Sequence, residues 1–270
     1  MKKNCKYFIL GILLIIGYGG FIFIQGRDDK VGHDPQITVP QAPLTVSVTS
    51  EESVLLQDVS ASDEEDGDLT SQVFIESISA FQENQTRTIT YAVFDSDDNL
   101  IRATRQLSYS DYQAPQITLT KALAFQYLES NDSLKDYVSA SSVVDGDLTS
   151  QIAIENVEYT NDSELWATFS VTDSCGTTSS LRLKGTYLNS QSNIEIELTE
   201  YLIRVPVGTV IRPMQYVSNV TFAGVSDSSL EEEIEVTNNY DPSAPGTYEY
   251  IYRISQGADT GYTKLVVIAQ

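Results

Sequence analysis

The sequence is poor in the residues from which most catalytic and metal sites are built. Its 270 residues include a single histidine, His33, and only two cysteines, Cys5 and Cys175. A Ser-His-Asp or Cys-His set needs a histidine in the globular part of the chain, and transition-metal ions prefer clusters of histidine and cysteine. We therefore expect a protein that is not an enzyme, with no catalytic residue and no transition-metal site.

Basic residues are also scarce. The chain has 16 Lys and Arg residues against 38 Asp and Glu residues, which gives a formal net charge of −22. A nucleic-acid-binding protein needs a basic face to neutralise phosphates, so nucleic acid is excluded as an expected partner. The acidity itself is typical of a soluble, self-repelling surface.

The one long apolar run lies near the N-terminus. Residues 1–6 are basic, and residues 7–25 contain no charged side chain. At ~1.5 Å per residue this run is just long enough to cross a hydrocarbon layer of about 30 Å. The lysines before it favour a cytoplasmic N-terminus. We expect a single-pass signal-anchor at 7–25 in the cell membrane, a hydrophilic tether at 26–34, and extracellular domains after it.

Cleavage of the apolar segment as a signal peptide is the alternative, and it would release a secreted protein. The small residues around Tyr18 could form the cleavage site, but a strongly apolar stretch follows them. In either case Cys5 and Cys175 would face different compartments and could not form a disulfide. Cys175 is therefore expected to be buried or inert.

A long internal repeat sets the number of domains. Residues 66–73 read Asp-Gly-Asp-Leu-Thr-Ser-Gln-Val, and residues 145–152 repeat them with Ile in the last place, at an offset of 79 residues. Such a period suits a small β-sandwich, which needs somewhat under ~100 residues. Three units of this size fit the chain beyond the tether, at 35–111, 114–187 and 193–270.

The local patterns within these units are those of strands and turns. Alternation of apolar and polar residues predicts half-buried strands, and helical periodicity is absent beyond the N-terminal apolar run. The clearest alternating segments are 44–48, 87–94, 100–107, 165–171 and 180–183. Clusters of Asp, Ser, Asn and Gly separate them. The predicted fold class is all-β, with three tandem immunoglobulin-like β-sandwiches after an N-terminal transmembrane helix.

The order of these landmarks resembles a known family. A Pro-Gln-Ile-Thr strand comes first, then Asp-Gly-Asp-Leu-Thr, then a hairpin of the form Tyr/Phe-x-Val-x-Asp-Ser. This order is similar to the bacterial immunoglobulin-like domains of surface proteins, including the Cry22Aa type and the hyaline-repeat modules. Units one and two carry the pattern, whereas unit three has lost the Asp-Gly-Asp. The resemblance implies a surface location, and such modules serve as spacers, adhesins and carbohydrate-binding accessories alike.

Acidic residues gather in the first unit, just before and within its Asp-Gly-Asp sequence. Calcium takes about six to eight oxygen ligands, and extracellular modules bind it weakly, with Kd values of roughly 10⁻⁴–10⁻³ M. Weakly bound Ca²⁺ is thus the one cofactor that the sequence suggests. The candidate ligands are Asp63, Glu65, Asp66 and Asp68.

The same residues have a second interpretation, in which they serve folding. Aspartate side chains accept hydrogen bonds from nearby backbone N–H groups, so Asp68 and Asp147 would cap short turns whose apolar residues face the core. The apolar pairs are Leu69/Val73, Leu148/Ile152 and Leu230/Ile234. All three units keep such an apolar pair, whereas the acidic residues before it become fewer from the first unit to the second. This difference favours the folding interpretation.

Aromatic residues supply the candidate interaction surface. In unit three the tyrosines alternate along one strand, and a further one lies on the next strand: Tyr248, Tyr250, Tyr252 and Tyr262. They would form either one packed face of a sheet or an exposed strip for a glycan or a protein partner. Trp166, inside an alternating strand, is expected in the core.

Together these observations predict a membrane-anchored bacterial cell-surface protein. Its tandem immunoglobulin-like domains would act as a stalk and as an adhesion or interaction module, without catalysis, and the partner would be a protein or a glycan at the cell surface. The alternatives are an accessory carbohydrate-binding protein and a purely structural spacer of the cell envelope.

Overall fold

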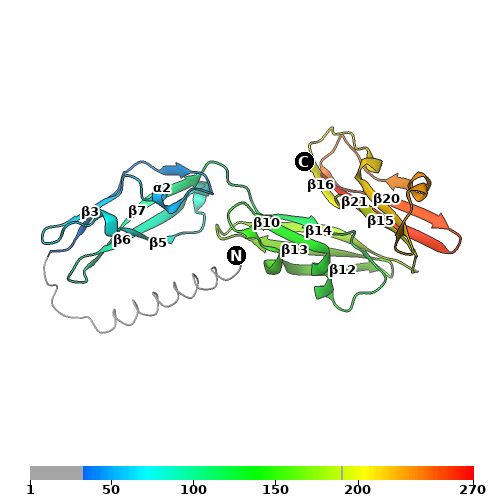
Figure 1. Cartoon of the computed structure of the whole chain (residues 1–270), viewed down its shortest axis with the longest axis horizontal. Coiled ribbons are helices and arrows are strands. Elements are labelled where there is room, and N and C mark those ends of the chain that lie inside the picture. Colours follow the sequence, from blue (N-terminus) through cyan, green and yellow to red (C-terminus); the bar gives the residue numbers. More distant parts are fainter. Residues whose placement is uncertain (1–32, 190) are drawn as a thin grey trace. The chain divides into compact units, whose positions relative to one another are not determined.

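The computed structural model describes residues 33–189 and 191–270 (Figure 1). The predicted signal-anchor at 7–25 and most of the tether lie outside these residues. Within the described part of the chain, no helix is long and apolar enough to cross a membrane. The described residues form two compact units. One comprises 33–44, 51–79 and 87–108, and the other comprises 45–50, 80–86 and the described residues from 109 to 270.

The first β-sandwich has a three-stranded and a four-stranded sheet. The smaller sheet has the order β1 (Gln36–Thr38), β3 (Ser60–Asp63), β4 (Gly67–Asp68). The larger sheet has the order β2 (Leu44–Val46), β7 (Leu100–Tyr109), β6 (Arg87–Phe94), β5 (Phe74–Ile78). Alternation works as expected in β6, where Ile89, Tyr91 and Val93 are fully buried.

The second sandwich repeats this arrangement. Its smaller sheet has the order β11 (Gly146–Asp147), β10 (Val138–Ser142), β8 (Gln116–Leu119). Its larger sheet has the order β12 (Ala153–Asn161), β13 (Glu164–Thr172), β14 (Thr178–Tyr187), β9 (Ala124–Phe125). The short strand β9 runs parallel to the end of β14, so the segment that begins with β8 passes from one sheet to the other.

The third sandwich keeps the same order of strands. Its smaller sheet consists of β15 (Ile194–Leu198), β17 (Val217–Phe222) and β18 (Val225–Ser226). Its larger sheet has the order β16 (Leu202–Val205), β21 (Asp259–Ala269), β20 (Gly246–Gln256), β19 (Glu235–Asn238), with β16 parallel to β21. The described residues are thus all-β with tandem β-sandwiches, and the strands of the three sandwiches lie within 35–111, 114–187 and 193–270.

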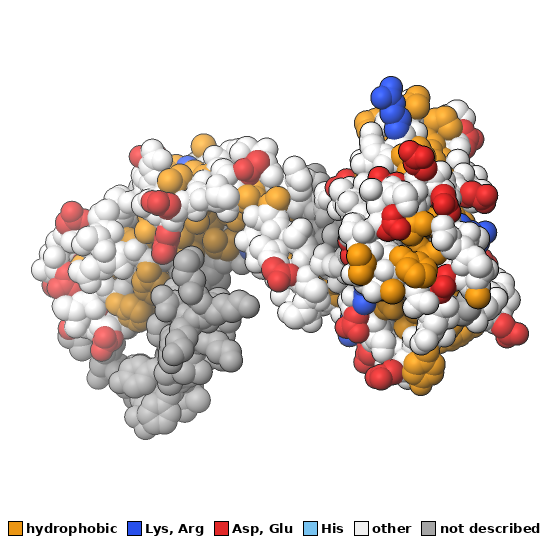
Figure 2. Space-filling view, turned by 45° about the vertical axis from the view of Figure 1, so that its right-hand side comes forward, with side chains coloured by type: hydrophobic (Ala, Val, Ile, Leu, Met, Phe, Trp, Pro, Cys, Tyr) orange, Lys and Arg blue, Asp and Glu red, His pale blue; other side chains and the backbone are white. Residues whose placement is uncertain are grey.

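In the part of the chain that the structure describes, helical segments are short. The α-helical turn there is α2 (Glu52–Leu55), and the 3₁₀ segments are Thr70–Gln72, Glu83–Gln85, Asn131–Tyr137, Thr149–Gln151, Pro213–Tyr216 and Ser228–Glu233. Cys175 is fully buried, as expected. Figure 2 shows the acidic side chains scattered over the visible surface rather than gathered in one patch.

The second and third sandwiches pack against each other within the second compact unit. Leu265 and Val267 of β21 point into the core of the third sandwich. Val266, between them in sequence, belongs instead to the core cluster of the second sandwich, as does Leu202 of β16. Strand β21 is therefore buried on both faces, which explains its unbroken apolar run from Leu265 to Ala269.

Candidate functional site

The repeated Asp-Gly-Asp sequence forms the same tight turn in the first two sandwiches. Gly67 and Gly146 have φ of +76° and +73°, in the left-handed region that favours glycine. Asp68 Oδ1 accepts the N–H of Thr70 at 2.9 Å, and Asp147 Oδ1 accepts that of Thr149 at the same distance. The second aspartate of the motif thus binds the first N–H of the following 3₁₀ turn, as the folding interpretation predicts, but it lies one position before the N-cap residue, which is the leucine.

The leucine after this aspartate anchors the turn in the core. Leu69 and Leu148 are each 2% exposed, and their N–H groups bond to the carbonyls of Ala61 and Ala140 at 2.9 Å. The third sandwich differs in detail: its single aspartate, Asp227, accepts the N–H of Ser229, and its own N–H bonds to the carbonyl of Val220 at 2.9 Å, as those of Leu69 and Leu148 do to theirs. Its leucine, Leu230, is also buried but comes three residues after the aspartate rather than directly after it.

The first aspartate of the motif joins two turns. Asp66 Oδ2 accepts the N–H of Ser96 at 2.7 Å, and Asp145 Oδ2 accepts the N–H of Ser174 at 2.8 Å. Each bond connects the Asp-Gly-Asp turn to the turn between two strands of the larger sheet. The repeated acidic side chains are thus engaged with backbone N–H groups.

The remaining candidate calcium ligands, Asp63 and Glu65, lie at the same end of the first sandwich. Asp63 Oδ1 accepts the N–H groups of Glu65 and Asp66 at 2.8 and 3.0 Å, and the second of these bonds contributes most to lowering the pKa of Asp63. Glu65 pairs with Nδ1 of His33 at 2.6 Å, which raises the pKa of His33.

Asp63 Oδ2 is buried without a hydrogen-bond partner. Even so, no group of three or more His, Cys, Asp or Glu side chains within 33–189 and 191–270 is placed to hold a metal ion. The calcium site at Asp63, Glu65, Asp66 and Asp68 stays a prediction. The structure assigns each of these carboxylates a partner in the turn or in the tether.

The four candidate tyrosines of the third sandwich have different environments. Tyr252 has no exposed surface, and Tyr250 is 6% exposed; both lie in the core. Burial raises the pKa of Tyr252, whose hydroxyl donates to the carbonyl of Pro213 at 2.9 Å. Tyr250 and Tyr252 therefore belong to the packed face of the sheet rather than to an exposed strip of tyrosines.

Tyr248 and Tyr262 are partly exposed. The Tyr248 ring meets that of Tyr240 edge to face, with centroids 5.3 Å apart, and its hydroxyl donates to Ala244. Tyr262 lies against the second sandwich, with the guanidinium of Arg253 5.5 Å from its ring centroid. Of the four tyrosines, Tyr262 is the one that also lines a cavity.

The expectation that Trp166 belongs to the core is wrong. On β13 its neighbours Leu165 and Ala167 take the inner face, so the alternation places Trp166 on the outer face. There the guanidinium of Arg182 lies 4.5 Å from the centre of the Trp166 ring. An alternating pattern alone does not say which of its two sets of residues faces inward.

A buried lysine joins the second and third sandwiches, and the sequence analysis missed it. Lys264 of β21 has no exposed surface. Its Nζ donates to Glu249 Oε1 at 2.7 Å and to the backbone carbonyl of Lys184 in the second sandwich. Lys184 in turn pairs with Glu164 at 2.9 Å. Burial lowers the pKa of Lys264, and the Glu249 carboxylate opposes that shift.

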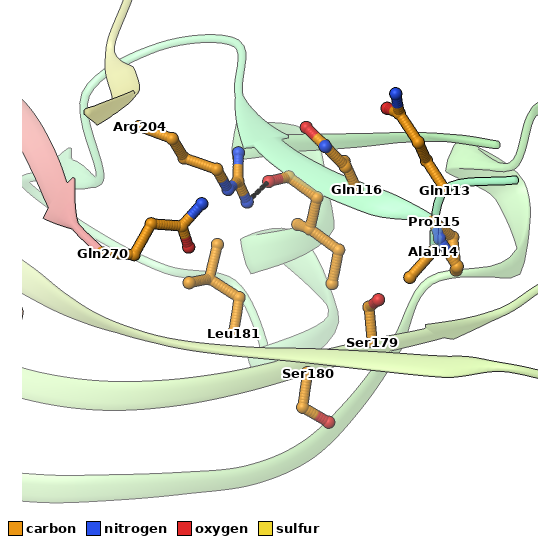
Figure 3. Close-up of a pocket in the computed structure, with 10 residues that line it drawn as sticks. Gln113, Ala114, Pro115, Gln116, Ser179, Ser180, Leu181, Arg204 and Gln270 are labelled. Carbon is orange, nitrogen blue, oxygen red and sulfur yellow. Dashed lines mark hydrogen bonds between the residues drawn. The ribbon is translucent and has the colours of Figure 1, made fainter. Parts of the chain in front are cut away.

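A cavity of about 490 Å³ lies between the same two sandwiches (Figure 3). Its lining residues are Gln113, Ala114, Pro115, Gln116, Ile117, Ser179, Ser180, Leu181, Arg204 and Gln270. Arg204 projects from β16 of the third sandwich, and its Nη2 donates to the carbonyl of Ile117 in β8 at 2.8 Å. Burial lowers the pKa of Arg204.

A second cavity, of about 730 Å³, also lies between these sandwiches. Tyrosines are its most frequent aromatic lining residues: Tyr137, Tyr187, Tyr201 and Tyr262. The ammonium of Lys121 lies 4.2 Å from the ring centroid of Tyr137. This cavity combines aromatic rings with charged and amide side chains.

These features define an all-β protein of tandem β-sandwiches. No protein-family model matches the chain, so the specific Cry22Aa-type resemblance stays a prediction, and no curated protein matches it. Solved structures do match. One contains the M60 catalytic domain with CBM51-1 and CBM51-2 of Clostridium perfringens ZmpB, at 9% identity and a TM-score of 0.23, covering 87% of this chain and 31% of that one. The present chain thus spans under a third of that structure.

Two other solved structures match this chain over almost their whole length. Human CDH23 EC21-23 is 12% identical, with a TM-score of 0.23, and the match covers 87% of this chain and all of that one, 100%. The lipoprotein BT2262 from Bacteroides thetaiotaomicron is 11% identical, with a TM-score of 0.21 and coverage of 86% and 98%. Scores in this range carry no argument about activity.

Proposed function

We propose that this protein is a non-catalytic, membrane-anchored surface protein of a bacterium, whose tandem immunoglobulin-like sandwiches form an arm that presents an interaction surface. The observation that carries the proposal is the junction between the second and third sandwiches. The buried Lys264, paired with Glu249 in the third sandwich, donates to the Lys184 carbonyl of the second. Leu202 and Val266 of the third sandwich pack into the core cluster of the second. An arm that holds a binding surface at a distance needs such a stiff connection.

The composition supports the same role. The uncharged run at 7–25, preceded by lysines, suits an anchor, and the acidic, histidine-poor remainder suits an extracellular part without catalysis. The recognition surface would lie on the third sandwich or at its junction with the second, where the partly exposed Tyr262 and Arg253 meet.

Cell fractionation and protease treatment of intact cells test the location. We expect the full chain in the membrane fraction, with the third sandwich accessible to external protease. Leu14→Arg, which places a charge in the apolar run, should reduce insertion because a central arginine costs roughly 2.5–3.5 kcal/mol. Leu14→Val is the matched control and should behave as the wild type. A cytoplasmic, protease-protected chain would contradict the proposal.

A second candidate function, accessory glycan binding, has one observation in its favour. Four tyrosines line the larger cavity, and sugar rings pack well on aromatic faces. A glycan array probed with the full chain tests this function. Tyr262→Ala should abolish any binding, whereas Tyr127→Ala, which removes a ring that is 75% exposed and lines neither cavity, should not. An array without binding would eliminate this candidate.

A further inference from the structure

The guanidinium of Arg204 is partly buried without an acidic partner. Its one side-chain hydrogen bond in the described part of the chain is donated to the carbonyl of Ile117, whereas a guanidinium has five N–H donors. Arg204 takes part in none of the ion pairs formed by the described residues. Removing a charge from water without a counter-ion is costly, so an anion would be favoured beside it.

The other side chains that line the cavity around Arg204 are uncharged. The remaining polar side chains are amides and hydroxyls: Gln113, Gln116, Gln270, Ser179 and Ser180. Although the chain has 38 acidic residues, none of the described residues that line the cavity is acidic. Figure 3 shows Arg204 and Gln270 at one end of the cavity and Gln113 and Ala114 at the other. Among the lining side chains, an anionic group in this cavity would meet one positive charge and no acidic group.

Two unpaired strand edges border the cavity. Strand β8 is the outer strand of its sheet. Strand β14 pairs with β9 only at Thr186 and Tyr187, so its earlier residues have a neighbouring strand on the β13 side alone. Gln116–Ile117 of β8 and Ser179–Leu181 of β14 line the cavity. Unpaired strand edges bind extended peptides through backbone hydrogen bonds.

The class of ligand follows from what the lining offers. No aromatic side chain is among the described lining residues, so a sugar ring finds no stacking surface. Leu181 offers an apolar contact for a small side chain, whereas the side chain of Ile117 is 1% exposed and lies in the core. The cavity volume of about 490 Å³ lies in the range of ordinary ligand sites. An arginine fork matches the two oxygens of a carboxylate.

We propose that this cavity binds the free C-terminal carboxylate of an extended peptide that ends in a small apolar residue. Arg204 binds the carboxylate, and the edges of β8 and β14 bind the peptide backbone. The inference goes beyond the proposed surface role, because it names a ligand class and holds wherever the protein resides. Failure of the binding test below would leave the location experiment unaffected.

The test compares two probes on the full chain in detergent. Fluorescein-labelled trialanine with a free carboxylate and the same peptide as its C-terminal amide are titrated, and binding is followed by fluorescence anisotropy. The free carboxylate is expected to bind at least about tenfold more tightly than the amide, as charge-assisted bidentate hydrogen bonds require. Equal affinities, or no binding of either peptide at millimolar protein, would overturn the proposal.

Variants locate the site. Arg204→Gln should abolish the preference for the carboxylate, and the matched control Arg212→Gln, which alters an arginine outside the cavity, should keep it. Gln116→Glu places a carboxylate in the lining without changing side-chain size, and it should also abolish the preference even if Arg204→Gln folds poorly. Retention of the preference in Gln116→Glu, or binding of glucuronic acid without binding of the peptide, would overturn the assignment.

Discussion

Lys264 and Glu249 form an ion pair at 2.7 Å in which the lysine has no exposed surface. The two residues lie on neighbouring strands, β21 and β20, on the face of the third sandwich that is covered by the second. The lysine also bonds to the backbone of Lys184 in that second sandwich. One charged group therefore serves both the sheet and the junction between two domains.

Breaking this pair from one side should be costly. Glu249→Gln leaves the Lys264 ammonium buried without its counter-ion, and we expect a loss of about 3–5 kcal/mol in the free energy of unfolding. Urea unfolding of the full chain in detergent measures it. Glu232→Gln, on an exposed turn of the same sandwich, should stay within about 0.5 kcal/mol of wild type. If the two variants were equally stable, the ion pair would not support the junction.

The leucine of the Asp-Gly-Asp-Leu-Thr sequence should matter more than the aspartate before it. Leu148→Ala leaves a cavity in a well-packed core, and we expect a loss of about 2–5 kcal/mol. Asp147→Ala removes one hydrogen bond to the N–H of Thr149 and should cost about 0.5–1.5 kcal/mol. Thermal unfolding of the two variants gives the comparison. A larger effect for the aspartate would contradict the folding role assigned to the leucine.

Stability of the first sandwich should fall in acid, in part through Asp68. The side chain and the backbone N–H of Thr70 hold the pKa of Asp68 below its ordinary value of 3.8. A lowered folded-state pKa contributes stability above the ordinary value, and this contribution is lost as the pH falls below it. Asp68→Asn should flatten the decline between about pH 5 and pH 2. Identical acid profiles for the variant and the wild type would show that this carboxylate is not involved.

The buried tyrosines should act on stability rather than on binding. Tyr252→Ala removes a ring with no exposed surface and should cost about 3–5 kcal/mol. Tyr252→Phe, which loses only the hydrogen bond to Pro213, should cost about 0.5–1.5 kcal/mol. Circular dichroism melts distinguish the two. A Tyr252→Ala chain that melts like wild type would place this ring outside the core.

Calcium should have little effect on the first sandwich. The carboxylates of Asp63, Asp66 and Asp68 already accept backbone N–H groups, and binding an ion there would compete with these bonds. We expect about 1 mM Ca²⁺, a concentration that suits extracellular sites, to leave the Tm unchanged. A calcium-dependent rise in Tm that Asp63→Asn removes would establish the site.

Local patterns were enough to predict much of the fold. Alternation and turn composition indicate strands, and the repeat of 79 residues indicates the size of the sandwich. The persistence of Leu69 and Leu148 indicates a core position, and both are buried. These features depend on interactions within a turn or between adjacent strands, which residues close in sequence control.

Only the tertiary structure decided which sheet faces are covered. Alternation separates the two faces of a strand but does not say what packs on the outer one, so Trp166 was assigned to the wrong face. The bonds of Lys264 to Lys184 and of Arg204 to Ile117 join residues 80 and 87 positions apart. No local pattern encodes such pairs, because they exist only when two complete sandwiches pack together. For the same reason, no sequence pattern predicts the cavity at Arg204, which is lined by residues of both sandwiches.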